Sequence, residues 1–256
     1  MKTVYYLLLL VALLSSAACT KPGIDGPSTG GKPQEGIVSG RVVDSQGKPV
    51  ANAVIVASNT DYYNKTSTGY TDASGNYRFK LPTGIAEGSY TVSGTVTLKY
   101  HNKNFEMGLY QEDTRVFSAY DGAVRNFVFR LTGKRAADDD ETSRPLGARL
   151  EVHPNFNKID SENLEITLEP VGPLVDGSTG KKLVAMMPQR SDYIEDIPVG
   201  MYKISARDKV SGQKLGVAIL GSSKAHESSL TTLFEKDQIV GSTLYDLAIT
   251  VDTFGD

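Results

Sequence analysis

Few side chains in this sequence stand at spacings that support catalysis. The chain of 256 residues has three histidines, His101, His153 and His226, and none belongs to an H-x-x-x-H or H-E-x-x-H pattern that places two imidazoles on one metal ion. No G-x-S-x-G elbow joins a strand to a helix, and no Gly-rich stretch carries the complete phosphate-binding pattern G-x-x-x-x-G-K-[ST]. We therefore expect no catalytic residue, no metal site and no cofactor, and we predict that the protein is not an enzyme.

Carboxylates occur in two groups that deserve separate interpretations. The run from Asp138 to Glu141 offers oxygen ligands for a hard cation, but calcium loops space their ligands and contain a turn glycine. A solvated acidic stretch is the interpretation that we favour for this run. Glu195 and Asp196 stand just before a predicted strand turn, where a charged loop rim is expected and a catalytic pair is not.

The single cysteine, Cys19, follows an apolar run at the N-terminus. Residues 4–14 are uninterrupted apolar side chains, too short to span a bilayer but typical of a signal-peptide core. Ser16-Ala17-Ala18-Cys19 is similar to a bacterial lipobox, although such signals usually begin with Leu and this one begins with Ser16. We predict a lipoprotein signal peptide at residues 1–18 and lipidation at Cys19; an ordinary secretory cleavage site beside an incidental cysteine is the alternative.

Aromatic and polar side chains gather in two predicted loops, which are the candidate binding loops. Tyr62 and Tyr63 lie between two predicted strands amid Asn, Asp, Lys and Thr, and Tyr100, His101 and Phe105 form a second cluster. Exposed rings can stack on a sugar or anchor a protein partner, and the alternative is that they cap the open ends of a β-sandwich. The chain has no Trp, which weakens a dedicated sugar platform.

The elements that must position these loops are predicted from composition and patterning. The chain is 39% hydrophobic and 22% charged, with a formal net charge of −3 at pH 7, so it suits a folded protein and offers no basic stripe for nucleic acid. Residues 19–36 are rich in Gly and Pro and predict a flexible tether. Residues 133–146 are charged, lack aromatics and predict an acidic linker between two domains, at 37–132 and 147–256.

Short segments with period-2 alternation dominate both predicted domains. Apolar side chains alternate with polar ones at Tyr77–Leu81, Tyr90–Ser93 and Phe127–Leu131, and again at Leu164–Glu169 and Leu247–Val251. Residues 52–58 are apolar on both faces, which predicts a central, covered strand. We expect an all-β chain of tandem antiparallel β-sandwiches, with at most a short helical turn within 222–237.

Two short segments echo each other across the halves. Gly88-Ser89-Tyr90-Thr91-Val92-Ser93 matches Gly200-Met201-Tyr202-Lys203-Ile204-Ser205, and each follows a proline at a short distance. The match favours two related sandwiches, or the same turn-into-strand device used twice.

Three further segments resemble carboxypeptidase regulatory-like domains. They are Gly40-Arg41-Val42-Val43-Asp44 with its Gly47-Lys48-Pro49 turn, Thr71-Asp72-Ala73-Ser74-Gly75-Asn76-Tyr77, and Leu81-Pro82 followed by Gly88-x-Tyr90-x-Val92. The resemblance covers roughly residues 37–95 and implies a transthyretin-like sandwich of about seven strands without catalysis. Within 147–256 only residues 197–206 show the pattern. The Asp, Ser, Gly and Asn of the 71–76 turn are expected to shape the chain and not to form a site.

The resemblance also implies a setting, because such domains are frequent in surface lipoproteins of Bacteroidetes-type bacteria. We therefore expect an outer-membrane lipoprotein of the cell envelope, held by its N-terminal lipid, that presents its sandwiches to a protein or glycan partner. A structural spacer or assembly subunit whose sheet edges pair with other chains is one alternative. A carbohydrate-binding accessory lipoprotein of a glycan-uptake system is the other.

Overall fold

A computed structural model describes residues 31–62, 65–82, 88–140, 143–188, 191–239 and 242–254. The prediction of an all-β fold is confirmed: in these ranges the chain forms strands β1 to β19 and a single short 3₁₀ helix, η1 (Ser161–Asn163). The helical turn considered within 222–237 does not form among the residues described there. That stretch instead supplies two short strands, β17 and β18.

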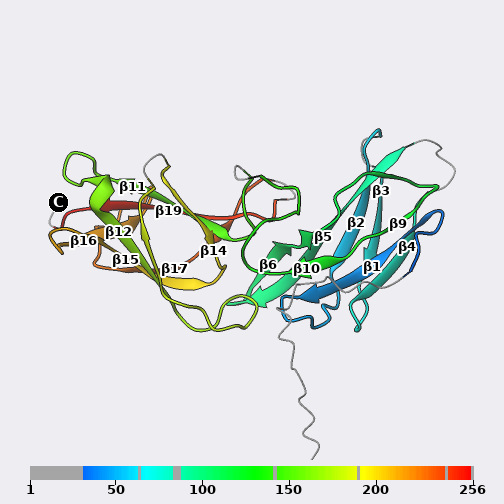
Figure 1. The fold of residues 1–256 in the computed structure, drawn as a ribbon. Coiled ribbons are helices and arrows are strands. Elements are labelled where there is room, and N and C mark those ends of the chain that lie inside the picture. The colour runs from blue at the N-terminus through cyan, green and yellow to red at the C-terminus, as the bar shows by residue number, and fades with distance from the viewer. Residues whose placement is uncertain are drawn as a thin grey trace, which may run out of the picture.

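The N-terminal domain is a sandwich of two sheets (Figure 1). One sheet has the order β4-β1-β10-β7, with β9 also paired to β1; the other has the order β3-β2-β5-β6, with β8 paired to β5. The bounds are β1 (Ile37–Asp44), β2 (Val54–Asn59), β3 (Thr66–Tyr70), β4 (Asn76–Lys80), β5 (Ser89–Tyr100), β6 (Lys103–Gly108), β7 (Tyr110–Gln111), β8 (Phe117–Ser118), β9 (Ala123–Val124) and β10 (Phe127–Phe129).

The C-terminal domain is also built from two layers, and they are joined through one strand. The connected order is β13-β12-β15-β16-β19-β11-β14, with β17 paired to β15 and β18 to β19. Strand β16 pairs with β15 through its first residues and with β19 through its last ones, so it passes from one layer to the other. The bounds are β11 (Ala148–Pro154), β12 (Leu164–Pro170), β13 (Leu183–Met186), β14 (Tyr193–Ile197), β15 (Met201–Asp208), β16 (Lys214–Ile219), β17 (Leu230–Leu233), β18 (Glu235–Lys236) and β19 (Tyr245–Asp252).

The two domains share one strand topology. The sheet β4-β1-β10-β7 corresponds to β14-β11-β19-β16, and β3-β2-β5-β6 corresponds to β13-β12-β15-β16. In the N-terminal domain the crossing strand is divided into β6 and β7, where Leu109 separates the part that pairs with β5 from the part that pairs with β10. The matched sequences noted above begin β5 and β15, and their tyrosines, Tyr90 and Tyr202, are each 1% exposed.

One sheet layer of each domain is mixed and not purely antiparallel, which corrects one detail of the expected architecture. Strand β1 runs parallel to β10 and to β9, and β11 runs parallel to β19. Parallel neighbours require a long crossover between them, and in each domain nearly the whole domain lies between the two paired strands. Period-2 alternation reports which face of a strand is buried, and it carries no information on the direction of the neighbouring strand.

Alternating apolar residues form the cores as predicted. Val38, Ile55 and Phe127 are fully buried in the N-terminal domain, as are Leu150 and Ile249 in the C-terminal domain, and the buried side chains of both domains form one continuous cluster. The prediction that residues 52–58 are covered on both faces is only partly correct. The face with Ala53, Ile55 and Ala57 is buried, while the opposite face of β2 is half-buried.

Asx turns connect several of these strands. In the turn before β4, the Asp72 carboxylate accepts hydrogen bonds from the backbone N–H groups of Ser74 (2.8 Å) and Asn76 (2.9 Å), and Gly75 has a φ of +75°. Asp44 and Asp208 act in the same way in two other turns. These bonds account for the Asp, Gly and Asn of the 71–76 segment by geometry alone.

The molecule is elongated, with the two domains end to end (Figure 1). Strand β1 begins at the outer end of the N-terminal domain, because it runs parallel to β10 and β10 leads toward the second domain. Strand β19 starts at the junction and carries the chain to the outer end of the C-terminal domain. Of the predicted tether, residues 31–35 are exposed, and the Gln34 side chain accepts a hydrogen bond from Arg78 (2.9 Å).

Candidate functional site

The first predicted binding loop is a polar turn between β2 and β3. Tyr62 is 48% exposed, and its backbone N–H donates to the side chain of Asn59 at 2.8 Å. The Lys65 ammonium lies 5.9 Å from the centre of the Tyr62 ring. Tyr63 lies outside the described residues. The Tyr62 ring is thus available to a partner, and its role in binding stays a prediction.

In the second predicted loop the rings of Tyr100 and Phe105 are buried, while the role of the exposed His101 in binding stays a prediction. His101 and Asn102 form the tight turn between β5 and β6, with φ values of +46° and +60°. His101 is exposed, but Tyr100 is 8% and Phe105 only 3% exposed. These two side chains point into the junction between the domains, so neither ring is free to stack on a ligand.

The junction is formed by direct contacts between β5, β6 and the second domain. The Tyr100 hydroxyl donates to the carbonyl of Pro173 at 2.8 Å and accepts a hydrogen bond from the N–H of Met201 at 3.0 Å. The Phe105 ring stacks on Tyr245, with 5.3 Å between their centroids and 22° between their planes. Burial of Tyr245 raises the pKa of its phenol to about 12.

Charged pairs flank the aromatic contact. Lys103 and Glu235 lie 3.0 Å apart, and Lys236 lies 2.7 Å from Glu106. Exposed ion pairs of this kind each contribute about 0–1 kcal/mol to stability. They therefore affect how the two domains are aligned more than how strongly they are held together.

The segment predicted as a linker, residues 133–146, is tied to both domains. The Asp196 carboxylate accepts hydrogen bonds from the N–H groups of Gly133 (2.8 Å), the first residue of that segment, and Gly147 (3.2 Å), the residue directly after it. Asp196 therefore holds the linker and does not form a charged rim. Such anchoring at both ends fits a fixed connection between the domains.

Residues of the acidic run are used within the same segment. Asp138 accepts a hydrogen bond from the Thr114 hydroxyl at 2.8 Å, and Asp139 accepts from the N–H groups of Arg135 and Ala136, both at 2.8 Å. Glu141 lies outside the described residues. Within the described ranges no group of three or more His, Cys, Asp or Glu side chains is arranged to hold a metal ion.

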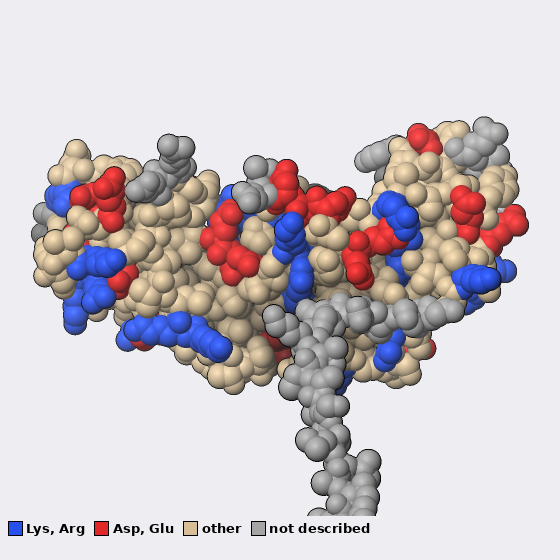
Figure 2. Space-filling model, viewed as in Figure 1, with Lys and Arg blue, Asp and Glu red and all other residues tan. Residues whose placement is uncertain are grey.

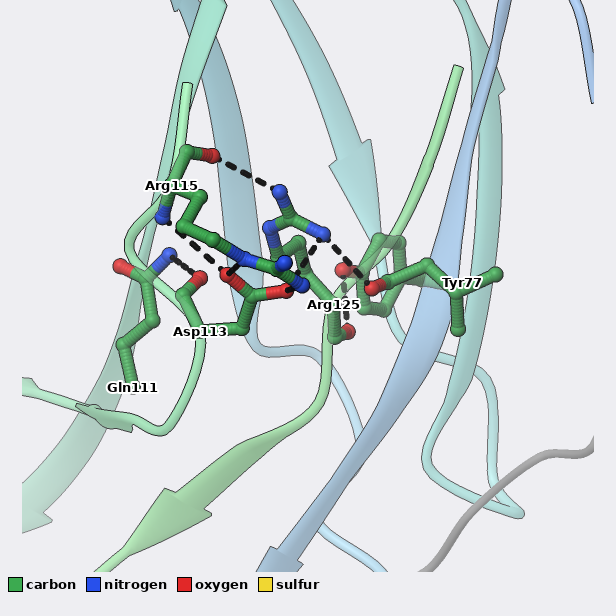
Figure 3. Close-up of polar contacts among 6 residues, drawn as sticks. Tyr77, Gln111, Asp113, Arg115 and Arg125 are labelled. Atoms are coloured by element: carbon green, nitrogen blue, oxygen red, sulfur yellow. Dashed lines mark hydrogen bonds and ion pairs between the residues drawn. The ribbon is translucent and has the colours of Figure 1, made fainter. Parts of the chain in front are cut away.

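A buried arginine that sequence reasoning missed joins three parts of the N-terminal domain (Figure 3). The Arg125 side chain is 9% exposed; one terminal nitrogen lies 3.0 Å from the Asp113 carboxylate, and the other donates to the carbonyl of Arg115 at 2.7 Å. The Tyr77 hydroxyl on β4 donates to the Arg125 carbonyl at 2.6 Å. No local pattern marks Arg125, because its partners come from separate loops and strands.

The electrostatics of this cluster indicate a structural latch. Burial lowers the pKa of Arg125 and raises that of Tyr77, whereas the pKa of Asp113 is lowered, first by its hydrogen bond with the Arg115 side chain. Both terminal nitrogens of the Arg125 guanidinium are engaged, and so is the Asp113 carboxylate (Figure 3). These contacts hold residues 111–125 against the sheet. The charged groups of the cluster are used within the fold and not for catalysis.

Two grooves in the C-terminal domain lie on either side of the strap between β16 and β17, residues 220–229. One has a volume of about 440 Å³ and is lined by apolar and polar residues of β16, the strap and β17. The other, of about 320 Å³, opens on the outer faces of β12 and β15 and is lined mainly by charged and hydroxyl side chains. The alternation of Lys203, Ser205 and Arg207 along the sequence was the only local signal of the second groove.

Comparison with known protein families gives one match, within the N-terminal domain. Residues 37–106 match the model of the carboxypeptidase regulatory-like domain, so the resemblance inferred from the turn motifs is confirmed for that segment. No curated protein matches the chain.

Solved structures show only distant similarity. The Bacillus anthracis TIE protein matches with 12% identity and a TM-score of 0.32, over 86% of this chain and 34% of that one. A streptococcal ancillary pilin matches with 12% identity and a TM-score of 0.26, over 83% and 61% of the two chains. A B repeat unit of the Staphylococcus aureus collagen-binding surface protein matches with 14% identity and a TM-score of 0.25, over 86% and 97%. The chain thus spans about a third of the length of the first of these proteins.

Proposed function

We propose that this protein is a lipid-anchored, non-catalytic recognition protein of the bacterial cell envelope. The observation that carries the proposal is the docked pair of sandwiches, in which a buried aromatic contact, Phe105 on Tyr245, joins two domains of the same topology. The described residues contain no cluster of reactive groups in a cleft, and exposed loops and grooves are left to bind a protein or glycan partner. A carboxypeptidase regulatory-like domain suits such an accessory role.

The geometry of the chain supports anchoring at one end. The proposed lipid site, Cys19, lies outside the described residues, and the chain enters the fold at the outer end of the N-terminal domain (Figure 1). A lipid on Cys19 would therefore leave the C-terminal domain as the part farther from the membrane. Two or more acyl chains on the modified cysteine would suffice for stable anchoring. Within the described ranges, the chain has no helix with the length and apolar character that a membrane crossing requires.

Metabolic labelling tests the anchor. With an alkyne fatty acid fed to the source bacterium, the wild-type chain is expected to carry the label and to sediment with outer membranes, whereas Cys19→Ser loses the label and leaves the membrane fraction. Unchanged processing of the wild-type chain under globomycin, which blocks lipoprotein signal cleavage, contradicts the anchor.

Partner capture tests the recognition role. Photo-crosslinking from a residue placed at Tyr62, followed by purification from native membranes, is expected to give a defined adduct. The same probe at Lys80, on β4, serves as the control. Adducts that are the same from both positions would count against recognition through the β2–β3 loop.

One observation favours an assembly subunit as a second candidate function. Among the described residues strand β13 pairs only with β12, which leaves its other edge unpaired there, and Val184 on β13 is 55% exposed. Open strand edges with exposed apolar side chains can pair with another chain. Sedimentation that shows self-association of the wild-type protein, abolished by Val184→Lys, would select this function; a monomer at all concentrations would reject it.

A further inference from the structure

The polar groove of the C-terminal domain has the composition of an anion-binding site. Its volume is about 320 Å³, enough to receive part of an oligosaccharide chain but too small for a folded protein element. Its lining contains three cations, one carboxylate and four hydroxyl groups, which are Lys203, Arg207, Lys214, Glu169, Thr167, Ser205, Ser228 and Ser229.

The strand geometry explains why these groups gather there. On β15 the apolar side chains of Tyr202, Ile204 and Ala206 face the core, so the alternate residues Lys203, Ser205 and Arg207 face outward. Strand β12 pairs with β15 and presents Thr167 and Glu169 on the same outer face. The strap between β16 and β17 adds its two serines as a rim, so the sheet face becomes a groove.

Two of the three cations of the groove have no ion-pair partner among the described residues, and the third is only partly used. Glu169 is paired with Lys182 at 3.0 Å, and Lys203 and Lys214 form no ion pair among the described residues. Arg207 uses only its Nε, at 2.6 Å from Glu165, and its side chain stays 54% exposed. The two terminal nitrogens of Arg207 therefore remain free to donate to a planar anion.

The neighbourhood adds further positive charge. Lys182 and Lys209 lie close enough to Glu165 to lower the pKa of its carboxyl, after the larger effect of the hydrogen bond with Arg207. On the face in Figure 2, basic and acidic side chains are interspersed over both domains, with a run of Lys and Arg along the lower edge of the C-terminal domain. A local excess of positive charge on a protein of net charge −3 indicates a confined anion site and not a general affinity for polyanions.

We infer that this groove binds an acidic oligosaccharide, whose carboxylate or sulfate groups meet Lys203, Arg207 and Lys214 while its hydroxyls meet Thr167, Ser205 and the strap serines. The inference rests on the proposed recognition function and supplies its ligand class. Acidic oligosaccharides present hydroxyl groups beside anionic groups, which match a groove lined by hydroxyls and cations. The only apolar residue in the lining is Ala206, whereas a membrane-surface site would expose larger apolar side chains.

The variants that test the groove are chosen so that the ion pair between Arg207 and Glu165 stays intact. Arg207 is left in place, because its removal would leave Glu165, with a side chain only 9% exposed, without its partner. The double variant Lys203→Gln/Lys214→Gln removes two exposed and unpaired charges from the groove. Its control, Lys48→Gln/Lys80→Gln, removes two exposed lysine charges from the N-terminal domain and leaves the same net charge.

The experiment uses isothermal titration of the full chain, in detergent if it is lipidated, with three oligosaccharides of equal length. They are an oligogalacturonate, its neutral methyl ester and a sulfated galactose oligosaccharide. We expect wild type and control to bind at least one acidic form and not the ester, and the groove variant to bind about tenfold or more weakly. Equal melting temperatures for the three proteins would show that the fold is retained. Comparison of the oligogalacturonate with the sulfated oligosaccharide shows whether the groove binds carboxylate or sulfate groups.

Three outcomes would overturn the inference: no binding of either acidic form to wild type, equal loss in the groove and control variants, or binding only to vesicles of anionic phospholipid. The recognition function is judged separately. If a partner is captured through the β2–β3 loop while the acidic sugars fail, the groove inference is wrong and the proposed function stands.

Discussion

At the scale of single residues, the N-terminal domain depends on a buried charge that its own loops neutralise. Arg125 is surrounded by Asp113, two backbone carbonyls and the ring of Phe117, which lies 5.3 Å from the guanidinium. Removing water from an arginine is costly, and the carboxylate offsets that cost only while it is ionised. The latch therefore makes the domain sensitive to acid.

The first prediction concerns Asp113→Asn. We expect this change to lower the free energy of unfolding by about 2 kcal/mol at pH 7, because Arg125 keeps its charge and loses its anion. The folded-state pKa of Asp113 is lowered, so its stabilisation is present above the ordinary carboxyl pKa of about 4 and is lost as the pH falls through the lowered value. The difference between variant and wild type should therefore shrink in acid.

Urea unfolding at neutral and acidic pH measures this difference. Asp121→Asn, at an exposed position of the same segment, is the matched control and should change little. Glu165, Asp208 and Asp252 also have lowered pKa values and add to the acid sensitivity of wild type in the same direction. A difference between wild type and Asp113→Asn that is the same at both pH values would show that the ion pair contributes nothing.

At the scale of elements, turns that depend on an aspartate and a glycine set where strands begin. Two glycines have similar backbone conformations in such turns: Gly47 with a φ of +81° and Gly75 with a φ of +75°. They differ in their surroundings. A Cβ on Gly75 would lie 2.4 Å from the carbonyl oxygen of Val42, whereas a Cβ on Gly47 would meet nothing within 4 Å.

The second prediction separates backbone strain from close contact. Gly47→Ala is expected to destabilise the protein by about 1 kcal/mol, the cost of a left-handed conformation for a residue with a Cβ. Gly75→Ala should cost at least about 1 kcal/mol more, because β1 and the turn before β4 must also move apart. Thermal unfolding of the two variants gives the comparison. Equal losses would mean that only the left-handed conformation demands glycine at position 75.

At the scale of the whole molecule, the junction makes the two sandwiches a single body. Tyr100 contributes the most specific contact, since its hydroxyl both donates to and accepts from the second domain. The ring also packs edge-on against Phe105, with centroids 5.6 Å apart. The hydroxyl therefore determines how the domains are oriented, and the rings determine how much apolar surface they bury.

The third prediction concerns Tyr100→Phe, which keeps the ring and removes both hydrogen bonds. The N–H of Met201 loses its acceptor at a part-buried site, and we expect a cost of about 1–3 kcal/mol. Hydrogen exchange at the Met201 amide should accelerate, and calorimetry should show the unfolding of the two domains becoming less cooperative. Tyr62→Phe, an exposed ring on a loop, is the control. The docking role of Tyr100 is refuted if the two variants show the same Met201 exchange rate.

Much of the fold was determined by local sequence. Alternation placed Tyr77, Tyr90, Ile204 and Ile249 in the core correctly, because a strand with one covered face needs an apolar residue at every second position. The turns that contain an aspartate and a glycine could also be predicted, since a turn depends on residues a few positions apart. The same turn motifs indicated the family of residues 37–106. The repeat of Gly-x-Tyr before two strands indicated the shared topology of the domains.

The tertiary structure alone determined which residues far apart in the chain contact each other. The sequence could not show that Tyr100 and Phe105 face the second domain, that Arg125 meets Asp113, or that β15 and the 220–229 strap enclose cations in a groove. An aromatic or charged side chain has the same local pattern whether it meets solvent, a ligand or another domain. Only the packing of distant strands determines which of these it meets, because burial and charge pairing are properties of the assembled surface.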